Sequence, residues 1–226
     1  MTTKNAIWIL IPVYNEGKII KKVLDSLHEN GYFNIILIDD GSSDNTFQEA
    51  SNSDVIALRH SLNRGKGAAL KTGIEAALRL KAKIIVTFDG DGQHDPKDIV
   101  KMTEHIYRGY DVVLGSRYLS KQTIPLIRRI GNLLANIWTF LLFGIWVTDS
   151  QSGLRAYTSE ALKVLDIQSE RYEVESEILR DIIRYNLFYI EVPMRVRYTR
   201  YSLNKSTKQN IYSGILTMGK LLLKGN

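Results

Sequence analysis

The chain has 226 residues, enough for one sizeable hydrophobic core and short for two, so we expect a single domain over 1–226. It contains no cysteine, which excludes disulfide scaffolds, cysteine-ligated zinc and thiol catalysis and fits a cytoplasmic protein. The net charge of +6 points to an anionic partner, which could be nucleic acid, an anionic membrane surface or a phosphorylated small molecule.

The positive charge is concentrated in the second half of the sequence. Residues 1–113 carry 14 basic against 15 acidic side chains, whereas residues 114–226 carry 16 against 9, and no acidic residue follows Glu191. Nucleic acid is the weakest candidate partner, because the basic tail has only three tyrosines for stacking and no recognition motif. We therefore expect no nucleic acid partner.

The first half alternates between apolar runs rich in Ile and Val, which read as buried strands, and helical patterns. The strands are expected at 6–13, 34–39, 54–58, 83–88 and 111–116, and the helices at 16–28, 44–51, 66–80 and 96–107. The last helix is predicted to open with Asp95 as its N-cap and Pro96 at its first position. This order predicts an α/β fold with a mostly parallel central sheet and helices on both faces.

The second half is less regular. We expect a long apolar helix from about Pro125 to Trp146, the short motif DSQSGLRAY at 149–157, helices near 159–166 and 173–185, a strand near 187–197 and a basic helix near 207–223. We interpret this half as a lobe that completes the same domain.

Polar, glycine-containing stretches follow four of the predicted strands. They cover residues 15–16, 39–44, 63–67 and 89–91. In a parallel sheet the carboxyl ends of the strands meet at one edge, where ligands bind. The sequence therefore predicts one site to which all four stretches contribute.

The stretch after the fourth strand, Asp89-Gly90-Asp91-Gly92-Gln93, carries two carboxylates two positions apart. Such an oxygen-rich array suits Mg²⁺ or Mn²⁺, which keep open positions for phosphate oxygens. The alternative is a polar turn in which Asp and Gly are simply good turn residues.

Two further stretches are candidates for ligand binding. Asp40 closes the second strand and could accept hydrogen bonds from ribose hydroxyls or a base N–H, whereas Asp44 is the better candidate for capping the next helix. Lys66, in the glycine-rich start of the third helix, could form an anion site, although the spacing is not that of a P-loop. The alternative for Lys66 is a helix start with solvated basic residues.

Several charged residues of the second half have two interpretations each. Arginines can bind phosphate bidentately or form surface ion pairs; they are Arg117, Arg128, Arg129, Arg155 and Arg200. Glu173, Glu175 and Glu177 lie where a helix dipole favours carboxylates. The four histidines show no metal-ligand spacing, and we interpret them as structural or solvated, with the exception that His94 lies inside the carboxylate motif.

Taken together, the motifs resemble those of the inverting glycosyltransferases of family 2, in the branch similar to dolichyl- and polyprenyl-phosphate sugar synthases. Six motifs occur in the family's order: IPVYNE (11–16), IDDGSSDNT (38–46), NRGKGAALKTG (63–73), FDGDGQHDP (88–96), GSR (115–117) and DSQSGLRAY (149–157). The resemblance implies a GT-A fold, a nucleotide-sugar substrate and Mg²⁺ or Mn²⁺ as cofactor. It also implies a nucleotide-sugar-binding half at 1–117 and an acceptor-side half at 118–226.

The resemblance also implies roles for individual residues. Those expected to hold the base and ribose are Pro12, Tyr14, Glu16 and Asp40, with Lys66 near the nucleotide-sugar. Those expected to bind the metal and the diphosphate are Asp89, Asp91 and Gln93. Those expected to handle the acceptor are Arg117, Arg129, Ser152, Arg155 and Arg200, the last in a loop where the resemblance is weaker.

The implied reaction is an attack of an acceptor oxygen on the anomeric carbon, opposite a nucleoside diphosphate whose charge the metal neutralises. A phosphate acceptor is already anionic and needs no strong base. A hydroxyl acceptor needs one, and Asp149 is the candidate that the motifs supply, with a turn-forming role as its alternative.

The apolar segment between Arg129 and Asp149 has 19 uncharged residues, close to the roughly 20 that a membrane span requires. A single crossing would separate two motifs that the family places in one cleft. We therefore expect an interfacial or groove-lining helix with possible lipid contacts at Trp138, Phe140, Phe143 and Trp146. The alternative is a core helix.

The favoured function is transfer of a sugar from a UDP- or GDP-sugar to a polyprenyl phosphate or another lipid-linked acceptor. The enzyme would be peripheral, at the cytoplasmic face of the membrane, where the basic tail could help to bind the bilayer. One alternative is a soluble family member that acts on a glycan or a small hydroxylated acceptor. Another is a catalytically silent nucleotide-binding protein.

Overall fold

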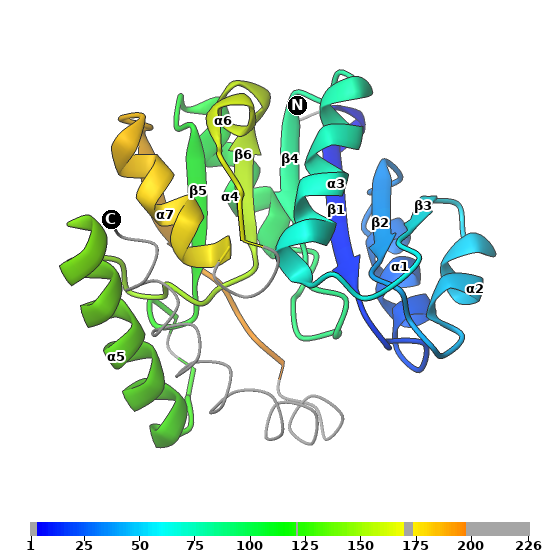
Figure 1. The fold of residues 1–226 in the computed structure, drawn as a ribbon, viewed down its shortest axis with the longest axis horizontal. Coiled ribbons are helices and arrows are strands. Elements are labelled where there is room, and N and C mark those ends of the chain that lie inside the picture. Colours follow the sequence, from blue (N-terminus) through cyan, green and yellow to red (C-terminus); the bar gives the residue numbers. More distant parts are fainter. Residues whose placement is uncertain (1–3, 121, 170–173, 198–226) are drawn as a thin grey trace.

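Residues 4–120, 122–169 and 174–197, which are the part of the chain that the computed structural model describes, place seven strands in one sheet (Figure 1). The strand order is β3-β2-β1-β4-β6-β5-β7. The strands are β1 (Ile7–Val13), β2 (Ile35–Asp39), β3 (Ile56–Arg59), β4 (Ile84–Thr87), β5 (Val112–Ser116), β6 (Arg155–Thr158) and β7 (Tyr189–Pro193). In this described part, β6 alone runs against the other strands.

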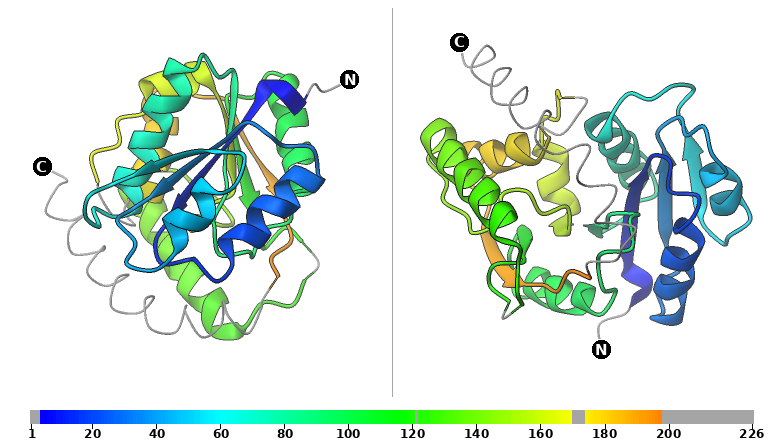
Figure 2. Two further views of the ribbon diagram at one scale, coloured as in Figure 1. Left: turned by 90° about the vertical axis from the view of Figure 1, so that its right-hand side faces the viewer. Right: turned by 90° about the horizontal axis from the view of Figure 1, so that it is seen from below.

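Helices cover both faces of the sheet (Figure 2). They are α1 (Ile20–Glu29), α2 (Thr46–Ser51), α3 (Lys66–Arg79), α4 (Asp98–Tyr107), α5 (Leu126–Phe143), α6 (Ser159–Val164) and α7 (Val174–Arg184), and a short 3₁₀ helix, Lys4–Ala6, precedes β1. Helices α1 and α4 pack on one face, and α3, α6 and α7 pack on the other.

The sequence of β1 shows how the two cores form. Successive side chains of a strand point to opposite faces, so Ile9 and Ile11 enter the core with α1 and α4, while Leu10 enters the core with α3. Both faces are buried, which explains why the strand is apolar throughout instead of alternating with polar residues.

Helix α3 approaches the sheet closely at Gly73. A Cβ atom at this position would lie 2.5 Å from Cδ1 of Leu10 and 2.6 Å from Cδ1 of Ile38.

We expect Gly73→Ala to lower the free energy of unfolding by about 1–3 kcal/mol, because the added methyl overpacks a filled core. Gly131→Ala is the matched control, since a Cβ there has no neighbour within 4 Å, and it should stabilise the protein by about 0.5–1 kcal/mol. Urea unfolding of both variants checks the sign of each change.

The predicted elements of the first half are confirmed, with three helix starts shifted. Helix α2 begins at Thr46 instead of Asp44. Helix α1 begins at Ile20, because Glu16–Ile19 form a turn in which the Glu16 carbonyl accepts hydrogen bonds from the N–H groups of Ile19 and Ile20. Helix α4 begins at Asp98 instead of Pro96, and the Asp95 carboxylate accepts a hydrogen bond from the Lys97 N–H at 3.0 Å.

The second half contains a strand that the sequence did not reveal. Strand β6 begins within the DSQSGLRAY motif, ends one residue after it, and pairs antiparallel with β4 on one side and β5 on the other. It has four residues, too few for a periodic pattern, and it is stabilised by its two neighbours. The predicted helices near 159–166 and 173–185 and the strand near 187–197 are confirmed by α6, α7 and β7, whereas the basic helix near 207–223 lies outside the described residues.

Candidate functional site

The loops that follow β1, β2 and β3 meet at the carboxyl edge of the sheet, as predicted. The N–H of Asn15 donates to Oγ of Ser42 at 2.8 Å, and the N–H of Glu16 donates to Oγ1 of Thr46 at 2.8 Å. Asp44, the predicted cap of the second helix, accepts hydrogen bonds from the N–H groups of Gly17 and Thr46, but the N-cap residue of α2 is Asn45. The first two loops are therefore held together by hydrogen bonds.

Asp40 links the loop after β2 to the loop after β3. Its carboxylate accepts hydrogen bonds from Nδ1 of His60 at 2.7 Å, from the N–H of Arg64 at 3.0 Å and from the N–H of Gly65 at 2.6 Å. The other ring nitrogen of His60 lies 3.0 Å from Oγ1 of Thr72 on α3, so of the two roles expected for the histidines, structural or solvated, His60 has the structural one. Asp40 is buried, and these contacts fix the start of α3.

The other residues expected around the base lie at the end of β1. Pro12 is half-buried within the strand, Tyr14 is 40% exposed, and Glu16 is buried. They border the same edge as Asp40.

The carboxylate motif after β4 lies at the centre of this edge. Oδ1 of Asp89 lies 2.9 Å from Nζ of Lys66, and its Oδ2 lies 3.1 Å from Nε2 of His94. Asp91 accepts hydrogen bonds from the N–H of Gln93 at 3.0 Å and from Nε2 of Gln93 at 2.5 Å.

The two aspartates have opposite electrostatic environments. Burial by itself would raise the pKa of Asp89, but the charge of Lys66 and the hydrogen bond from His94 hold that pKa well below its usual range. Burial and the negative charge of Asp89 together raise the pKa of Asp91. The pair therefore contains a repulsion that a bound cation would relieve.

The residues present fit a hard divalent cation. The candidate ligands are oxygens of two neighbouring aspartates and of Gln93, the ligand type that Mg²⁺ and Mn²⁺ prefer. Gly153, in the loop before β6, lets the Asp89 carboxylate lie directly against the backbone, because a Cβ at this position would overlap that carboxylate. In the described part of the chain, no three His, Cys, Asp or Glu side chains form a complete metal cage, so substrate oxygens or water would have to complete the coordination.

We expect Gly153→Ala to weaken metal binding by at least about tenfold, because the methyl group must displace Asp89. The measurement is the Mn²⁺ dissociation constant from isothermal titration calorimetry. The control is the circular dichroism spectrum, which should be unchanged. Unaltered Mn²⁺ affinity would show that metal binding does not depend on this position of the Asp89 carboxylate.

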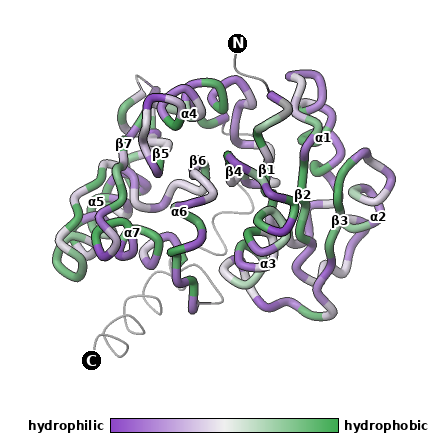
Figure 3. Tube along the Cα trace, turned by 90° about the horizontal axis from the view of Figure 1, so that it is seen from above, coloured by the Kyte–Doolittle hydropathy of each residue, from purple (hydrophilic) through white to green (hydrophobic). Residues whose placement is uncertain are grey.

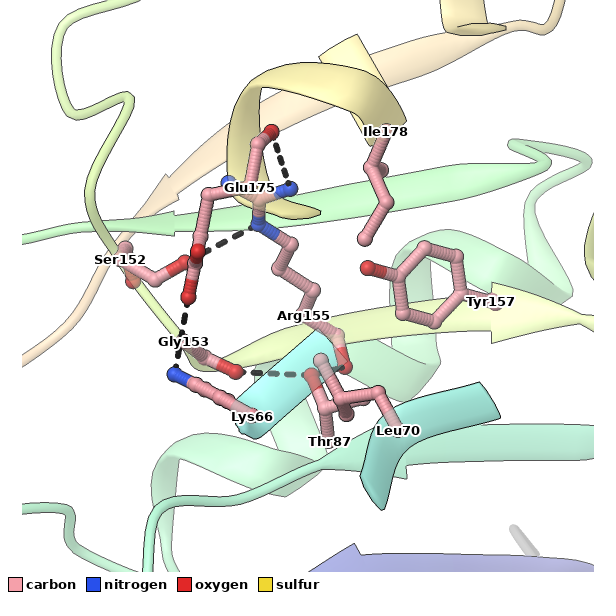
Figure 4. A pocket seen from close by; sticks show the side chains of 9 residues that line it. All are labelled: Lys66, Leu70, Thr87, Ser152, Gly153, Arg155, Tyr157, Glu175 and Ile178. Atoms are coloured by element: carbon pink, nitrogen blue, oxygen red, sulfur yellow. Dashed lines mark hydrogen bonds and ion pairs between the residues drawn. The ribbon is translucent and has the colours of Figure 1, made fainter. Parts of the chain in front are cut away.

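Lys66 joins the carboxylate motif to α7. Its Nζ lies 2.9 Å from Oδ1 of Asp89 and 2.9 Å from Oε1 of Glu175, and Figure 4 shows the lysine and the glutamate pointing toward each other beside a small pocket. Burial alone would lower the pKa of Lys66, but the charges of Asp89 and Glu175 raise it overall. Lys66 therefore remains charged at neutral pH.

On the other side of the site, Arg117 and Asp149 form a bidentate ion pair. Nε of Arg117 lies 2.7 Å from Oδ2 of Asp149, and a terminal nitrogen of Arg117 lies 2.6 Å from Oδ1. The N–H of Arg117 also donates to Oδ2 at 3.0 Å. Asp149 is 2% exposed, so both of its oxygens are engaged and shielded from water.

Arg155 and Ser152, which were expected to handle the acceptor, are both buried. The Arg155 guanidinium is buried and donates hydrogen bonds to the backbone carbonyls of Ser150, Ser152 and Glu175. The Ser152 hydroxyl lies 3.6 Å from Sδ of Met194. These contacts hold the loop before β6 in place and give neither side chain an exposed surface.

The two remaining arginines of the predicted set differ in position. Arg129 is exposed near the start of α5. Arg200, like Glu173, lies outside the described residues.

Sequence reasoning missed two glutamates that organise the site. Glu175 was explained by the helix dipole, and its ion pair with Lys66 depends on a contact between α3 and α7 that no local pattern encodes. Glu191 on β7 accepts hydrogen bonds from the N–H groups of Thr148 and Asp149. Its place as the last acid before a basic tail was the only available signal.

A mostly parallel sheet with an Asp-x-Asp pair at the end of a central strand is the arrangement of the GT-A glycosyltransferases. The model of "Glycosyl transferase family 2" matches residues 8–171. The chain belongs to this family and is a glycosyltransferase.

The relatives extend over nearly the whole chain. An uncharacterized protein of Methanocaldococcus jannaschii is 45% identical, covering 98% of this chain and 93% of its own length. The UDP-N-acetylglucosamine–dolichyl-phosphate N-acetylglucosaminyltransferase of Methanococcus voltae is 41% identical, with coverages of 96% and 95%. The polyprenol monophosphomannose synthase of Mycolicibacterium smegmatis is 26% identical, with coverages of 96% and 87%.

Solved structures support the fold. Glucosyl-3-phosphoglycerate synthase from Mycobacterium tuberculosis, in complex with Mn²⁺, UDP and phosphoglyceric acid, aligns with a TM-score of 0.66 and 21% identity, over 94% of this chain and 78% of its own. A complex of the same enzyme with Mg²⁺ and UDP gives a TM-score of 0.67. At this identity the likeness shows the GT-A fold.

Proposed function

We propose that the protein transfers a sugar from a UDP- or GDP-sugar to a polyprenyl phosphate, with inversion at the anomeric carbon, at the cytoplasmic face of the membrane. Mg²⁺ or Mn²⁺ would be held by Asp89, Asp91 and Gln93. The relatives from M. voltae and M. smegmatis support this acceptor class, because their names contain dolichyl phosphate and polyprenol monophosphomannose.

The observation that carries the proposal is that the Asp149 carboxylate is buried and bonded to Arg117. A hydroxyl acceptor needs a general base, and Asp149 is the candidate that the motifs supply. Both of its oxygens accept hydrogen bonds from Arg117, and burial keeps it from water, so it is poorly placed to take a proton. A phosphate acceptor is already anionic and needs no base, and a guanidinium beside it supplies the complementary charge.

The remaining residues have compatible roles. The cation, when bound, supplies Lewis-acid stabilisation of the charge on the departing nucleoside diphosphate. Lys66 places a fixed positive charge beside Asp89, Asp40 orders the loop that leads into α3, and Arg117 with Arg129 provides the cationic side for the acceptor.

Helix α5 supports a lipid acceptor, because its apolar face points outward. It is long and apolar enough to cross a membrane by length and composition, yet only 17% of it is buried. In Figure 3 it lies beside α7 at the end of the molecule beyond β7. The exposed apolar residues of α5 and of the segment after it are Leu126, Ile127, Ile130, Leu133, Leu134, Ile137, Phe140, Leu141 and Trp146.

We propose that this face lies in the membrane interface. Arg128 and Arg129 at its start complement anionic lipids. Arg117 and Asp149, on either side of α5 in the sequence, are joined by their ion pair, which a single crossing of the bilayer by α5 would disrupt. Of the four predicted lipid contacts, Phe140 and Trp146 are exposed, whereas Trp138 and Phe143 are half-buried.

The function is tested with a panel of UDP- and GDP-sugars and Mg²⁺ or Mn²⁺, using polyprenyl phosphate and water-soluble glycans as acceptors. We expect metal-dependent product on the lipid phosphate. Transfer to a soluble hydroxylated acceptor alone would contradict the proposal, and the absence of any turnover would favour a catalytically silent protein.

The membrane contact is tested with a triple variant, Ile127→Ser, Leu134→Ser and Leu141→Ser. Because these exposed side chains would bury apolar surface in lipid, we expect binding to anionic vesicles to weaken on the order of 100-fold, measured by flotation. The matched control replaces Leu62 and Phe188, which are equally exposed on other elements, by serine. Equal losses in both proteins would contradict a specific role of α5, and so would no loss in either.

A further inference from the structure

Helix α5 turns its polar face toward the protein and its apolar face toward the outside, the reverse of a usual surface helix. The apolar stripe of such a helix normally packs against the core while its polar face meets water. In α5 the buried residues are instead polar: Asn132, Asn136 and Thr139. The hydrophobic effect therefore holds the inner face of this helix weakly, and its hydrogen bonds carry more of the attachment.

Two of these residues bind the same backbone group. Nδ2 of Asn132 and Nδ2 of Asn136 donate to the carbonyl oxygen of Thr148, at 2.8 and 3.0 Å. Oδ1 of Asn136 also accepts a hydrogen bond from the N–H of Ser150 at 3.1 Å. The inner face of α5 therefore grips the turn formed by residues 148–150.

The same turn is fixed from the opposite side by the sheet. Glu191 on β7 accepts hydrogen bonds from the N–H of Thr148 at 2.9 Å and from its hydroxyl at 2.8 Å. The Thr148 hydroxyl also lies 2.6 Å from Oγ of Ser116, the residue before Arg117. With its N–H and its carbonyl both held, the Thr148 backbone has one orientation, and that orientation directs the neighbouring Asp149 to Arg117.

We propose that Asn132 and Asn136 are positioning residues, which couple the lipid-facing helix α5 to the Arg117–Asp149 pair and thereby align Arg117 for the phosphate of the lipid acceptor. This inference rests on the proposed function, because it assigns the acceptor to the same site. The outer face of α5 meets the bilayer, the inner face holds the 148–150 turn, and the turn holds Asp149. No step of the chemistry passes through either asparagine.

The test compares the double variant Asn132→Ala/Asn136→Ala with the wild-type protein in steady-state kinetics on polyprenyl phosphate in vesicles. We expect KM for the lipid phosphate to rise about tenfold, the loss of one well-placed hydrogen bond to a charged group, while KM for the nucleotide-sugar changes less than about twofold. The single variant Asn136→Gln keeps an amide donor and an amide acceptor at this position. Its KM for the lipid phosphate should therefore lie closer to the wild-type value than the KM of the double variant does. Thr139→Ala is the matched control, since Thr139 is buried on the same face and makes no hydrogen bond to the 148–150 turn among the described residues.

If the two asparagines only kept the protein folded, the double variant would change the kinetic constants in a different way. A general loss of folded protein would lower kcat and leave both KM values in place, so the active fraction is measured by nucleotide titration. An unchanged acceptor KM in an active double variant would overturn the coupling, as would an equal rise for both substrates, with the proposed function intact. If the wild-type protein fails to use polyprenyl phosphate, the proposed function and the inference fall together, and that result is seen before any variant is tested.

Discussion

Replacing Asp91 with asparagine is expected to lower sugar transfer by about two to three orders of magnitude while making the metal-free protein more stable. The two effects share one cause. Asp91 and Asp89 are held close together, and the negative charge of Asp89 raises the pKa of Asp91 in addition to its burial. On the proposed function, the unfavourable charge pair is retained because it would bind a divalent cation.

The sign of the stability change follows from the direction of the pKa shift. An aspartate whose pKa is raised in the folded protein stabilises the fold only when protonated, so stability is lost as the pH rises from the unfolded pKa through the raised folded pKa. At neutral pH Asp91 is therefore destabilising, and asparagine removes that cost. Asparagine can still accept the hydrogen bond from the Gln93 N–H.

The measurement is thermal unfolding with and without Mn²⁺, together with transfer activity. Metal-free Asp91→Asn should unfold at a higher temperature than the wild-type protein, and added Mn²⁺ should no longer raise the transition. The control is Asp95→Asn in the same loop, since Asp95 binds the Lys97 N–H and Arg197 and lies outside the carboxylate pair. If Asp91→Asn retains metal-dependent transfer, the proposed metal site is wrong.

Replacing Asp149 with alanine is expected to cost about 3 kcal/mol of folding free energy, because it leaves the partly buried Arg117 without its carboxylate. For a chain of this size the thermal transition should fall by roughly 6–12 °C. Transfer to the lipid phosphate should fall as well, since an unrestrained arginine no longer presents a fixed guanidinium.

A double-mutant cycle separates positioning from base catalysis. If Asp149 acts through Arg117, the double variant Arg117→Ala/Asp149→Ala should transfer sugar no more slowly than Arg117→Ala alone, because the two residues work as one unit. If the loss of activity in the double variant instead equals the product of the losses in the two single variants, Asp149 acts independently of Arg117, as a residue that takes a proton would. Activity is compared at a temperature where every variant is folded.

Local patterns in the sequence were sufficient for the first half of the chain. Apolar runs of Ile and Val formed strands, and the polar stretches after them met at one edge, because parallel strands bring their carboxyl ends together. The carboxylate pair at Asp89 and Asp91 could be located for the same reason, since both residues follow directly from the end of β4.

The second half of the chain could be predicted less well, because its arrangement depends on long-range pairs. Strand β6 is too short for a periodic signal and is inserted between strands from other parts of the chain. The contacts of Glu191 with Thr148 and of Glu175 with Lys66 join residues far apart in the sequence. Arg155 looked like a phosphate ligand by residue type, and only the packed structure shows its guanidinium buried on backbone carbonyls.

By itself, the sequence determined the class of fold, the family, the place of the Asp89 and Asp91 carboxylates and the concentration of positive charge in the second half, because these features depend on residue type and local spacing. The tertiary structure decided how the second half of the chain is arranged. It showed that Asp149 is engaged by Arg117 and that α5 turns its amides inward and its apolar residues outward. A sequence pattern gives the two faces of a helix, but which face is buried depends on the groups that the rest of the fold places against it.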